Sequence, residues 1–445
     1  MEESETLDLL ISGGTLLTMS HDMKVIEDPV IGVRGGTILF VRENENDSLP
    51  YRAQETIDAS GSVIIPGLIN THTHLPMVAF RGMADDLELM DWLENHIFPA
   101  EAQFVNREMV YHCSLLSIAE MILSGTTTFC DGYFFEDGVA EAAIEAGMRG
   151  MPCQGFVDFP TSDIPDPAQR AAAAQAFIRK WSGASPLINP ALFCHAPYTC
   201  SPETLSMIKG IARDGDVPFL IHLAETQGEV ADIVERYGTT PARHLHRLDL
   251  LDDRTIAVHC VWLDKGEMDI LAEGGVKVSH TPESNMKLAA GIAPVVEMLS
   301  RGITVGLGTD GCASNNDLDL TLEMGTAARI HKVSSMDPTV MDARTVLKMA
   351  TIGGAQVLGL DDRVGSVEAG KRADITIIDM DKPHLTPRYD EYSHIVYAAG
   401  GSDVKTVIID GRIVMEDRRL LTIDEDAVMA KVREIAERIK KGLEK

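Results

Sequence analysis

Short apolar runs separated by glycine and polar residues occur near both ends of the chain. Runs of this length, bounded by turn residues, predict β-strands. The predicted terminal strands are Leu7–Ile11, Val30–Val33, Thr37–Val41, Ala373–Ile378, Val404–Ile409 and Arg412–Met415. The last two are joined by Asp410-Gly411, a pair that favours a tight hairpin turn. Because the two ends resemble each other, residues 1–65 and 366–445 are predicted to share one small β-domain.

The middle of the chain, residues 66–365, follows a different pattern, in which apolar strand-like runs alternate with helical stretches. This alternation is typical of βα units around a parallel sheet. The strand-like runs cover residues 63–70, 126–131, 150–156, 191–195, 219–223, 256–260, 276–280 and 305–310. Eight such runs, with room for a helix between them, predict an α/β fold built as a closed (β/α)8 barrel of the TIM type.

The last segment, residues 424–445, shows a helical period. Its apolar residues recur at three- and four-residue steps among charged ones, which predicts a helix with one apolar face. They are Val428, Met429, Val432, Ile435 and Ile439. This helix is expected to pack against the body of the protein.

Composition restricts the partners and the compartment. The chain has 39 basic and 68 acidic side chains, a formal net charge of −29, so it would repel nucleic acid and anionic membranes. Its seven cysteines are scattered and form no Cys-X-X-Cys pair, which indicates free thiols. The start, Met1–Thr6, is acidic, and no apolar run reaches the ~20 residues that cross a bilayer. A soluble, cytoplasmic protein is expected.

Polar residues stand at the predicted carboxyl ends of the barrel strands, where catalytic groups gather in such barrels. His72 and His74 are two residues apart, so on an extended backbone both rings point to one side. A nitrogen from His222 and a carboxylate oxygen from Asp310 would complete a set that suits zinc, and also iron or manganese. The sequence predicts one such divalent metal per chain, able to lower the pKa of a bound water to ~7.

A carboxylate follows the third of these histidines. Glu225 lies three residues beyond His222, beside the predicted metal, and is predicted to act as a proton shuttle. The alternative is a structural carboxylate in the first turn of the following helix, a place that acidic residues favour.

Three further strand-end histidines differ in their setting. His280 could donate to the attacking water or to developing charge. His195, which precedes Pro197 and Tyr198, is expected to contact substrate. His259 is as compatible with a packed barrel wall as with a functional role. Ordinary surface or interface roles are expected for the histidines in predicted helices, which are His112, His244, His246 and His331.

Several strings of residues resemble a known superfamily. Pro66-Gly67-Leu-Ile-Asn70-Thr-His72-Thr-His74 resembles the opening motif of the amidohydrolases. Longer strings resemble the 5′-methylthioadenosine/S-adenosylhomocysteine deaminases within them. These are His222-Leu-Ala-Glu225-Thr, His280-Thr-Pro-Glu-Ser-Asn285-Met-Lys-Leu-Ala and Gly308-Thr-Asp310-Gly-Cys-Ala-Ser-Asn315-Asn-Asp317. The resemblance spans nearly the whole chain.

The resemblance implies a role for each of these residues. His72, His74, His222 and Asp310 would bind one zinc, while Glu225 and Asp310 handle protons and His280 assists the nucleophile. For the substrate, the resemblance implies that Trp92 forms a wall of the pocket and that Glu101 binds the ribose hydroxyls. It also implies that Gln154, His195 and Glu225 contact the nucleoside. The resemblance further implies that the terminal strands form a small β-sandwich and that subunits associate as dimers or tetramers.

The implied reaction is the hydrolytic deamination of an adenosine-type nucleoside, with release of ammonia. Activated water would attack C6 of the adenine while Glu225 protonates N1 and Asp310 takes the proton of the water. Many relatives place an arginine for the amino-acid tail of S-adenosylhomocysteine near the position of Gln154. Because this chain has glutamine and not arginine there, 5′-methylthioadenosine, 5′-deoxyadenosine or adenosine is predicted to be preferred over S-adenosylhomocysteine. This prediction holds unless Arg149 or Arg170 reaches the tail.

Two other functions remain open at this point. Another mononuclear amidohydrolase would act on guanine, a pterin or an s-triazine, although a base without ribose would not need Glu101. A barrel that binds a metal without turnover would not need Glu225 and His280. A binuclear hydrolase is disfavoured, because its bridging lysine would be expected where Cys194 and His195 stand.

Overall fold

Eight parallel strands form the centre of the molecule. In this computed structural model, which describes residues 6–44 and 52–443, they are hydrogen-bonded to one another in sequence order. They are β8 (Leu68–Thr73), β9 (Thr126–Tyr133), β10 (Arg149–Phe156), β11 (Ala191–Cys194), β12 (Phe219–Leu223), β13 (Thr255–His259), β14 (Lys277–His280) and β15 (Val305–Leu307). Beyond the last strand, the Asp310 amide donates to His72 O at 3.0 Å and brings the two edges together. The predicted barrel is confirmed.

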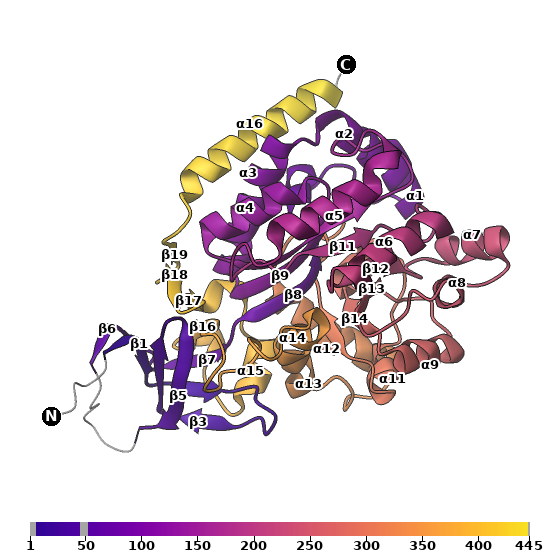
Figure 1. The fold of residues 1–445 in the computed structure, drawn as a ribbon. Coiled ribbons are helices and arrows are strands. Elements are labelled where there is room, and N and C mark those ends of the chain that lie inside the picture. Colours follow the sequence, from indigo (N-terminus) through magenta and orange to yellow (C-terminus); the bar gives the residue numbers. More distant parts are fainter. Residues whose placement is uncertain (1–5, 45–51, 444–445) are drawn as a thin grey trace.

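Helices surround the strands (Figure 1). After β8 come η1 (Leu75–Phe80), α1 (Leu89–Trp92), η2 (Leu93–Ile97), α2 (Phe98–Phe104) and α3 (Arg107–Leu123). The following units contribute α4 (Glu136–Ala146), η3 (Pro167–Gln169), α5 (Arg170–Trp181), α6 (Pro202–Asp214), α7 (Gln227–Tyr237), α8 (Pro241–Arg247) and α9 (Lys265–Gly274). The last units contribute α10 (Pro282–Lys287), α11 (Val295–Ser300), α12 (Leu320–Ser335), α13 (Ala343–Ala350) and α14 (Ile352–Leu358).

Two further sheets are built from both ends of the chain. The first has the order β5-β4-β1-β6 and the second β19-β18-β17-β16-β7-β2-β3. The N-terminal strands are β1 (Leu7–Ser12), β2 (Thr15–Leu17), β3 (Val25–Glu27), β4 (Pro29–Arg34), β5 (Thr37–Glu43), β6 (Ala53–Asp58) and β7 (Ser62–Pro66). The C-terminal strands are β16 (Ile375–Asp379), β17 (Val404–Ile409), β18 (Arg412–Glu416) and β19 (Arg419–Leu420). Between β16 and β17 the chain forms η4 (Pro383–Leu385), α15 (Glu391–Tyr397) and η5 (Gly401–Asp403).

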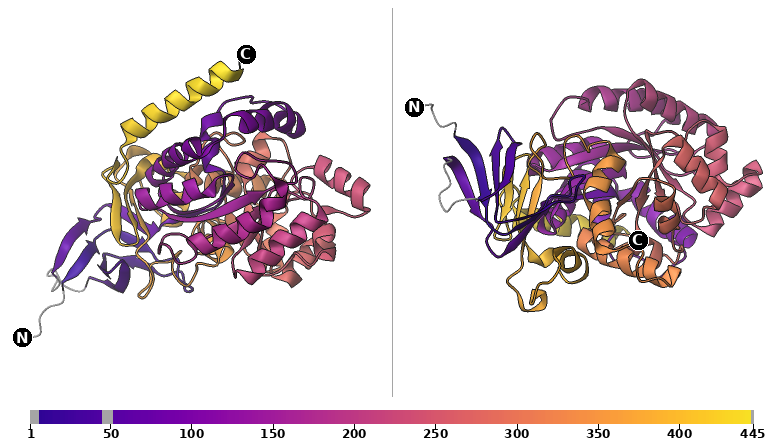
Figure 2. Two further views of the ribbon diagram at one scale, coloured as in Figure 1. Left: turned by 45° about the horizontal axis from the view of Figure 1, so that its top comes forward. Right: turned by 90° about the horizontal axis from the view of Figure 1, so that it is seen from below.

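The two sheets pack face to face at one end of the barrel, as both views of Figure 2 show. Leu9 and Ile31 of the first sheet and Ile64, Ile375 and Ile408 of the second belong to one buried cluster. The expected β-sandwich from both termini is confirmed. The acidic start of the chain, residues 1–5, lies outside the described residues.

The predicted run 63–70 is wrong as a single strand, because it divides at Gly67. Its first half belongs to β7, which pairs with β16 in the sandwich, and its second half belongs to β8 in the barrel. A Cβ at Gly67 would collide with the side chain of Thr127. Glycine therefore permits the close backbone approach at which the chain passes from one sheet to the other.

A buried ion pair joins the sandwich to the barrel. Arg149, at the start of β10, is fully buried; its Nε donates to Asp374 Oδ2 at 2.8 Å and its Nη2 to Asp410 Oδ1 at 3.1 Å. Because parallel strands place their amino ends together, this pair lies at the opposite end of the barrel from the predicted site. Arg149 therefore does not reach a substrate tail.

The C-terminal helix, α16 (Glu425–Leu443), packs along α3 at the side of the barrel (Figure 1). Val428, Val432, Ile435 and Ile439 are buried on its inner face, as the helical period predicts. Among the described residues, no helix is long and apolar enough to span a bilayer.

Candidate active site

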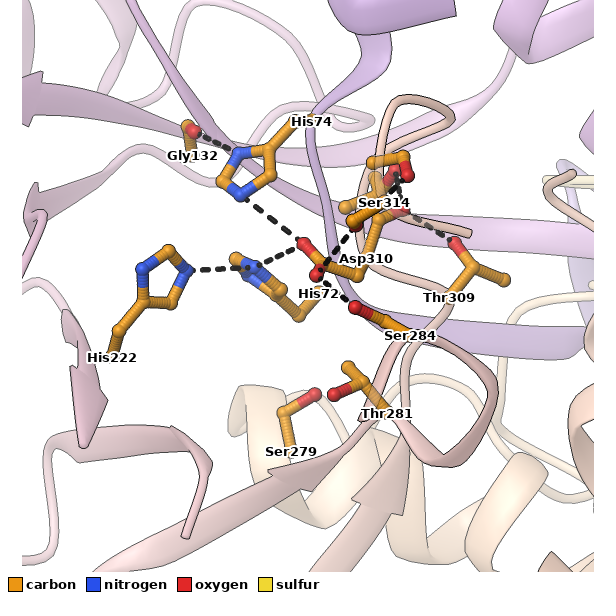
Figure 3. Close-up of polar contacts among 12 residues, drawn as sticks. His72, His74, Gly132, His222, Ser279, Thr281, Ser284, Thr309, Asp310 and Ser314 are labelled. Carbon is orange, nitrogen blue, oxygen red and sulfur yellow. Dashed lines mark hydrogen bonds and ion pairs between the residues drawn. The ribbon is translucent and has the colours of Figure 1, made fainter. Parts of the chain in front are cut away.

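Four predicted metal ligands meet at the carboxyl ends of three barrel strands (Figure 3). Nε2 of His72 lies 3.1 Å from Nε2 of His222 and 3.4 Å from Oδ1 of Asp310, and Nε2 of His74 lies 3.3 Å from the same oxygen. All four side chains are buried. The separation of two residues between His72 and His74 does aim both rings at one point, as expected for an extended strand.

Hydrogen bonds orient two of these groups. His74 Nδ1 lies 2.6 Å from the carbonyl oxygen of Gly132 and donates its proton to it. The lone pair of Nε2 is therefore available to bind a metal. Asp310 Oδ2 accepts from Ser284 Oγ at 2.7 Å and from Ser314 Oγ at 2.9 Å. Oδ1 of Asp310 is thereby turned toward the histidines.

The chemistry of this donor set fits one divalent cation. Three imidazole nitrogens and one carboxylate oxygen suit zinc, and such a set leaves room for water. Burial alone would raise the pKa of Asp310, but hydrogen bonding to His72 and His74 holds that pKa well below its usual value. The carboxylate is therefore available as an anionic ligand.

Glu225 stands next to this donor set, in the turn between β12 and α7. Its side chain is buried, and burial raises the pKa of the carboxyl group above its ordinary value. Its Oε2 lies 3.8 Å from Nε2 of His259. A carboxyl group with a raised pKa holds a proton more readily than a free one, which favours the role of proton shuttle.

His259 is directed into the site rather than into the barrel wall. Its Nδ1 lies 3.0 Å from Asn285 Oδ1 and 2.9 Å from Thr281 Oγ1, so its Nε2 faces Glu225. A nitrogen of His259 also groups with those of His72 and His222 within 4.8 Å. The backbone of His259 is left-handed, with φ of +69°, a conformation that costs free energy and is often found at functional sites.

His280 occupies a different place from the one expected. Its Nε2 lies 3.0 Å from Nε2 of His331, a buried residue of α12. The ring of His280 does not line the pocket that contains His74, His222 and Asp310. The geometry therefore places His259, and not His280, beside Glu225 and the donor set. His331 is not the ordinary surface residue that its helical position suggested.

A pocket opens at the donor set, and four of the five expected substrate contacts line it. Glu225, described above, is one of them. Trp92, Glu101 and His195 all contribute to this main pocket. The rest of its lining is mostly apolar. The full set is His74, Met77, Leu89, Trp92, Leu93, Ile97, Phe98, Glu101, Gly132, Tyr133, Phe134, Gly155, Phe156, Val157, Phe159, Phe193, His195, Tyr198, His222, Glu225, His259, Leu288, Asp310 and Ser314.

Glu101 is a further carboxyl group of the main pocket, besides Glu225 and Asp310. Burial raises its pKa to about 7, although Tyr133, whose hydroxyl donates to Oε1 at 2.6 Å, acts in the opposite direction. Its remaining oxygen can accept hydrogen bonds from a ligand, which is the property that binding of a ribose diol requires.

A side pocket continues from the main pocket past the shared residues Phe98, Glu101, Phe134 and Phe159. Its other residues are Ala102, Pro160, Thr161, Ser162 and Pro165. Within the described part of the chain, no lysine or arginine lines either pocket. Arg170 is turned to Asp158, whose Oδ1 lies 3.4 Å from Nη1.

Gln154 lies behind the pockets rather than in their lining. Its Nε2 donates to Asp163 Oδ2 at 2.8 Å and to Gly155 O at 3.2 Å. Asp163 also accepts from the backbone amide of Phe135. Gln154 thus anchors the loop that carries the wall of the side pocket.

Comparison with known proteins places this site in a family. The sequence pattern of the Amidohydrolase family matches residues 63–414. A protein of Syntrophobacter fumaroxidans named 5-methylthioadenosine/S-adenosylhomocysteine deaminase is 49% identical over 98% of this chain and 99% of its own. A protein of Methanosarcina mazei named 5′-deoxyadenosine deaminase is 45% identical over 97% of this chain and 98% of its own.

A solved structure agrees with these relatives. An adenosine deaminase from Xanthomonas campestris, crystallised with bound zinc, superposes with a TM-score of 0.96 at 39% identity and covers 98% of this chain and 99% of its own. Since the family pattern covers most of the sequence and the relatives match over nearly its full length, the chain belongs to the amidohydrolase family.

Proposed function

We propose that this protein is a zinc-dependent hydrolytic deaminase of adenosine-type nucleosides. One observation carries the proposal: Glu225 lies beside the buried donor set at the base of a pocket that also contains Glu101. Relatives named as deaminases of adenosine derivatives support this function over one on guanine, a pterin or an s-triazine. They also favour an enzyme over a barrel that only binds metal.

Each residue has a defined task in this proposal. His72, His74, His222 and Asp310 would hold the cation, which would lower the pKa of water to ~7 and make a nucleophile available at neutral pH. Glu225 donates a proton to N1 of the adenine, and Asp310 accepts the proton that the water loses. Asp310 then passes this proton to the amino group, which leaves as ammonia when its bond to C6 breaks. His259 hydrogen-bonds the attacking oxygen, a task that the sequence favoured for His280.

The remaining pocket residues bind the nucleoside. Glu101 accepts from the ribose hydroxyls, His195 contacts the nucleoside, and Trp92 forms part of the wall. The acceptor strength of Glu101 falls when it is protonated, so nucleoside KM should rise as the pH drops below about 7. This direction follows because only the carboxylate form offers all its lone pairs to the diol.

Ammonia release tests the function directly. The purified protein, loaded with zinc, is incubated with adenosine, 5′-deoxyadenosine, 5′-methylthioadenosine, guanine, a pterin and an s-triazine. Turnover of the nucleosides alone is the expected result. Turnover of guanine or the triazine in their place would contradict the proposal, and an absence of ammonia from every compound would favour the metal-binding barrel.

The first quantitative prediction concerns the metal. One tightly bound divalent metal per chain is expected, because Nε2 of His72 lies 3.1 Å from His222 Nε2 and 3.4 Å from Asp310 Oδ1, and His74 approaches the same oxygen. Elemental analysis of the purified protein measures the stoichiometry. Exhaustive chelation should abolish turnover and readdition of one equivalent of zinc should restore it. A requirement for two equivalents, or full activity after chelation, would contradict a mononuclear site.

The second prediction concerns the 5′ substituent. No lysine or arginine stands among the described lining residues of either pocket, so the carboxylate of S-adenosylhomocysteine would find no ammonium or guanidinium group there. Hydrogen bonds to charged groups contribute ~1.5–3 kcal/mol, so kcat/KM should favour 5′-methylthioadenosine by roughly 10- to 150-fold. A preference for S-adenosylhomocysteine would contradict the prediction.

Substitution of Gln154 refines this test. An arginine at position 154 would meet Asp163, which already lies 2.8 Å from the Gln154 amide nitrogen, and would be neutralised by it. Gln154→Arg alone is therefore expected to change little. Gln154→Arg combined with Asp163→Asn should improve kcat/KM for S-adenosylhomocysteine and not for 5′-methylthioadenosine.

Assembly and compartment complete the proposal. We infer a homodimer or homotetramer that works in the cytoplasm on a small-molecule nucleoside, without a nucleic acid or membrane partner. The net charge of −29 and the seven buried, free cysteines support this setting. Light scattering of the purified protein measures the number of subunits.

A further inference from the structure

A buried carboxylate outside the pocket holds the turn that carries Glu225. Glu229, on the first turn of α7, accepts from two consecutive backbone amides: Ala224 N to Oε1 at 2.9 Å and Glu225 N to Oε2 at 2.8 Å. Only 5% of Glu229 is exposed. Both oxygens of one carboxylate are thus used to hold the backbone at and immediately before the proposed proton shuttle.

This arrangement departs from ordinary helix capping. Thr226 is the N-cap of α7, and its side chain accepts from the amide of Glu229. In a capping box the third helical residue reaches back to the amide of the N-cap residue. Glu229 instead reaches past Thr226 to the two residues before it. Its side chain therefore stabilises the turn between β12 and α7 in addition to the helix.

The turn needs such support because its backbone is strained. Ala224 has a φ of +50°, a left-handed conformation that costs free energy for a residue with a Cβ. On its other side the turn is tied to the end of β13, since Trp262 N donates to Ala224 O at 2.9 Å and Cys260 N to Leu223 O at 3.0 Å. Glu225 is thereby fixed relative to His259, which belongs to β13.

We propose that Glu229 is a positioning residue for catalysis, which acts by fixing the backbone of Glu225 against the metal donor set. This inference rests on the proposed role of Glu225. A misplacement of about 1 Å can cost on the order of 100-fold in rate. Loss of one of the two amide hydrogen bonds should therefore lower kcat by roughly 10- to 100-fold, with little change in KM, because Glu229 does not line the pocket.

The test uses Glu229→Gln and Glu229→Asp in the zinc-loaded protein. The amide of glutamine can accept from only one of the two backbone amides, and aspartate is one carbon too short to reach both. The matched control is Glu267→Gln. Glu267 is equally buried, occupies the same position on α9, and completes an ordinary capping box with Asp264, whose amide donates to it at 2.9 Å.

A double-mutant cycle distinguishes positioning from general destabilisation. If Glu229 acts through Glu225, then Glu229→Gln should lower kcat in the parent but add almost nothing in a Glu225→Gln background. Zinc content should remain at one equivalent in every variant. An equal fold-loss of kcat in both backgrounds, or a loss matched by Glu267→Gln, would overturn the proposal.

Two further results keep the inference separate from the proposed function. If the parent releases no ammonia from any nucleoside, the proposed function fails first. If the parent is active and Glu229→Gln and Glu229→Asp both retain parental kcat, the positioning role alone fails. If circular dichroism shows that Glu229→Gln does not fold, the same double-mutant cycle is measured with Glu229→Asp.

Discussion

Replacement of Glu225 by glutamine is expected to lower kcat by ~100- to 10,000-fold, the usual contribution of general acid–base catalysis. Glutamine keeps the shape of the side chain and the hydrogen bond between its backbone amide and Glu229, but it cannot accept and release a proton. Burial raises the pKa of Glu225 above its ordinary value, and its place in the pocket beside the donor set makes it the carboxyl group positioned to transfer a proton. Single-turnover and steady-state rates of ammonia release measure the loss.

The position of Glu225 beside the donor set makes two controls necessary. Zinc content, measured by elemental analysis, should stay at one equivalent per chain, because the four donor atoms come from other residues. Glu235→Gln makes the same chemical change on the exposed face of α7 and should leave kcat unaltered. If kcat of Glu225→Gln were within a few-fold of the parent value, another residue would be the proton shuttle. Loss of zinc would indicate that Glu225 is a metal ligand.

The metal donors could be predicted from sequence because their orientation follows from regular strands. In an extended strand, side chains two residues apart point the same way, so His72 and His74 had to face one side. The carboxyl ends of parallel strands meet at one end of a barrel, so His222 and Asp310 had to lie near them. These rules need only the strand boundaries, which the alternation of apolar and helical segments supplied.

His259 and His280 could not be ranked by the same rule, because each ends a strand at its last residue. His259 has a left-handed backbone, which breaks the alternation of the pleat and turns its ring toward Glu225. His280 is turned to His331, a contact between residues 51 positions apart that no local pattern reveals. A left-handed conformation at a residue other than glycine has no strong signature in composition.

The division at Gly67 was hidden for a related reason. Apolar residues continue through Ile65, Pro66, Leu68 and Ile69, because both halves of the run are buried, one in the sandwich and one in the barrel. The pattern of apolar residues shows that a strand is buried, but it does not show which strand it pairs with. The glycine was the available signal, since an isolated glycine in a strand often marks a close backbone approach. The position of Gln154 behind the pocket likewise depends on its hydrogen bond to Asp163, a residue of the loop that follows β10.

Arg149→Met is expected to cause the largest loss of stability among single substitutions at the boundary between the barrel and the sandwich. Removing one member of a buried ion pair leaves an uncompensated charge and typically lowers the free energy of unfolding by ~3–5 kcal/mol. Here the fully buried Arg149 bridges Asp374 and Asp410, so Asp374 would lose its arginine partner, while Asp410 would keep its ion pair with Arg372. Urea denaturation, followed by circular dichroism, measures the change.

Two variants separate the buried charge from the simple loss of an arginine. Arg254→Met removes the partner of Asp216 in an exposed pair, with side chains 44% and 83% exposed, and should cost no more than ~1 kcal/mol. Arg149→Met combined with Asp374→Asn should recover part of the stability, because asparagine removes the buried charge while its Oδ1 can still accept from the amide of Asp410, now 2.8 Å away. If the double variant were less stable than Arg149→Met, the loss would come from packing rather than from unpaired charge. Zinc content and kcat of folded Arg149→Met should match the parent, since this ion pair and the metal donors lie at opposite ends of the barrel.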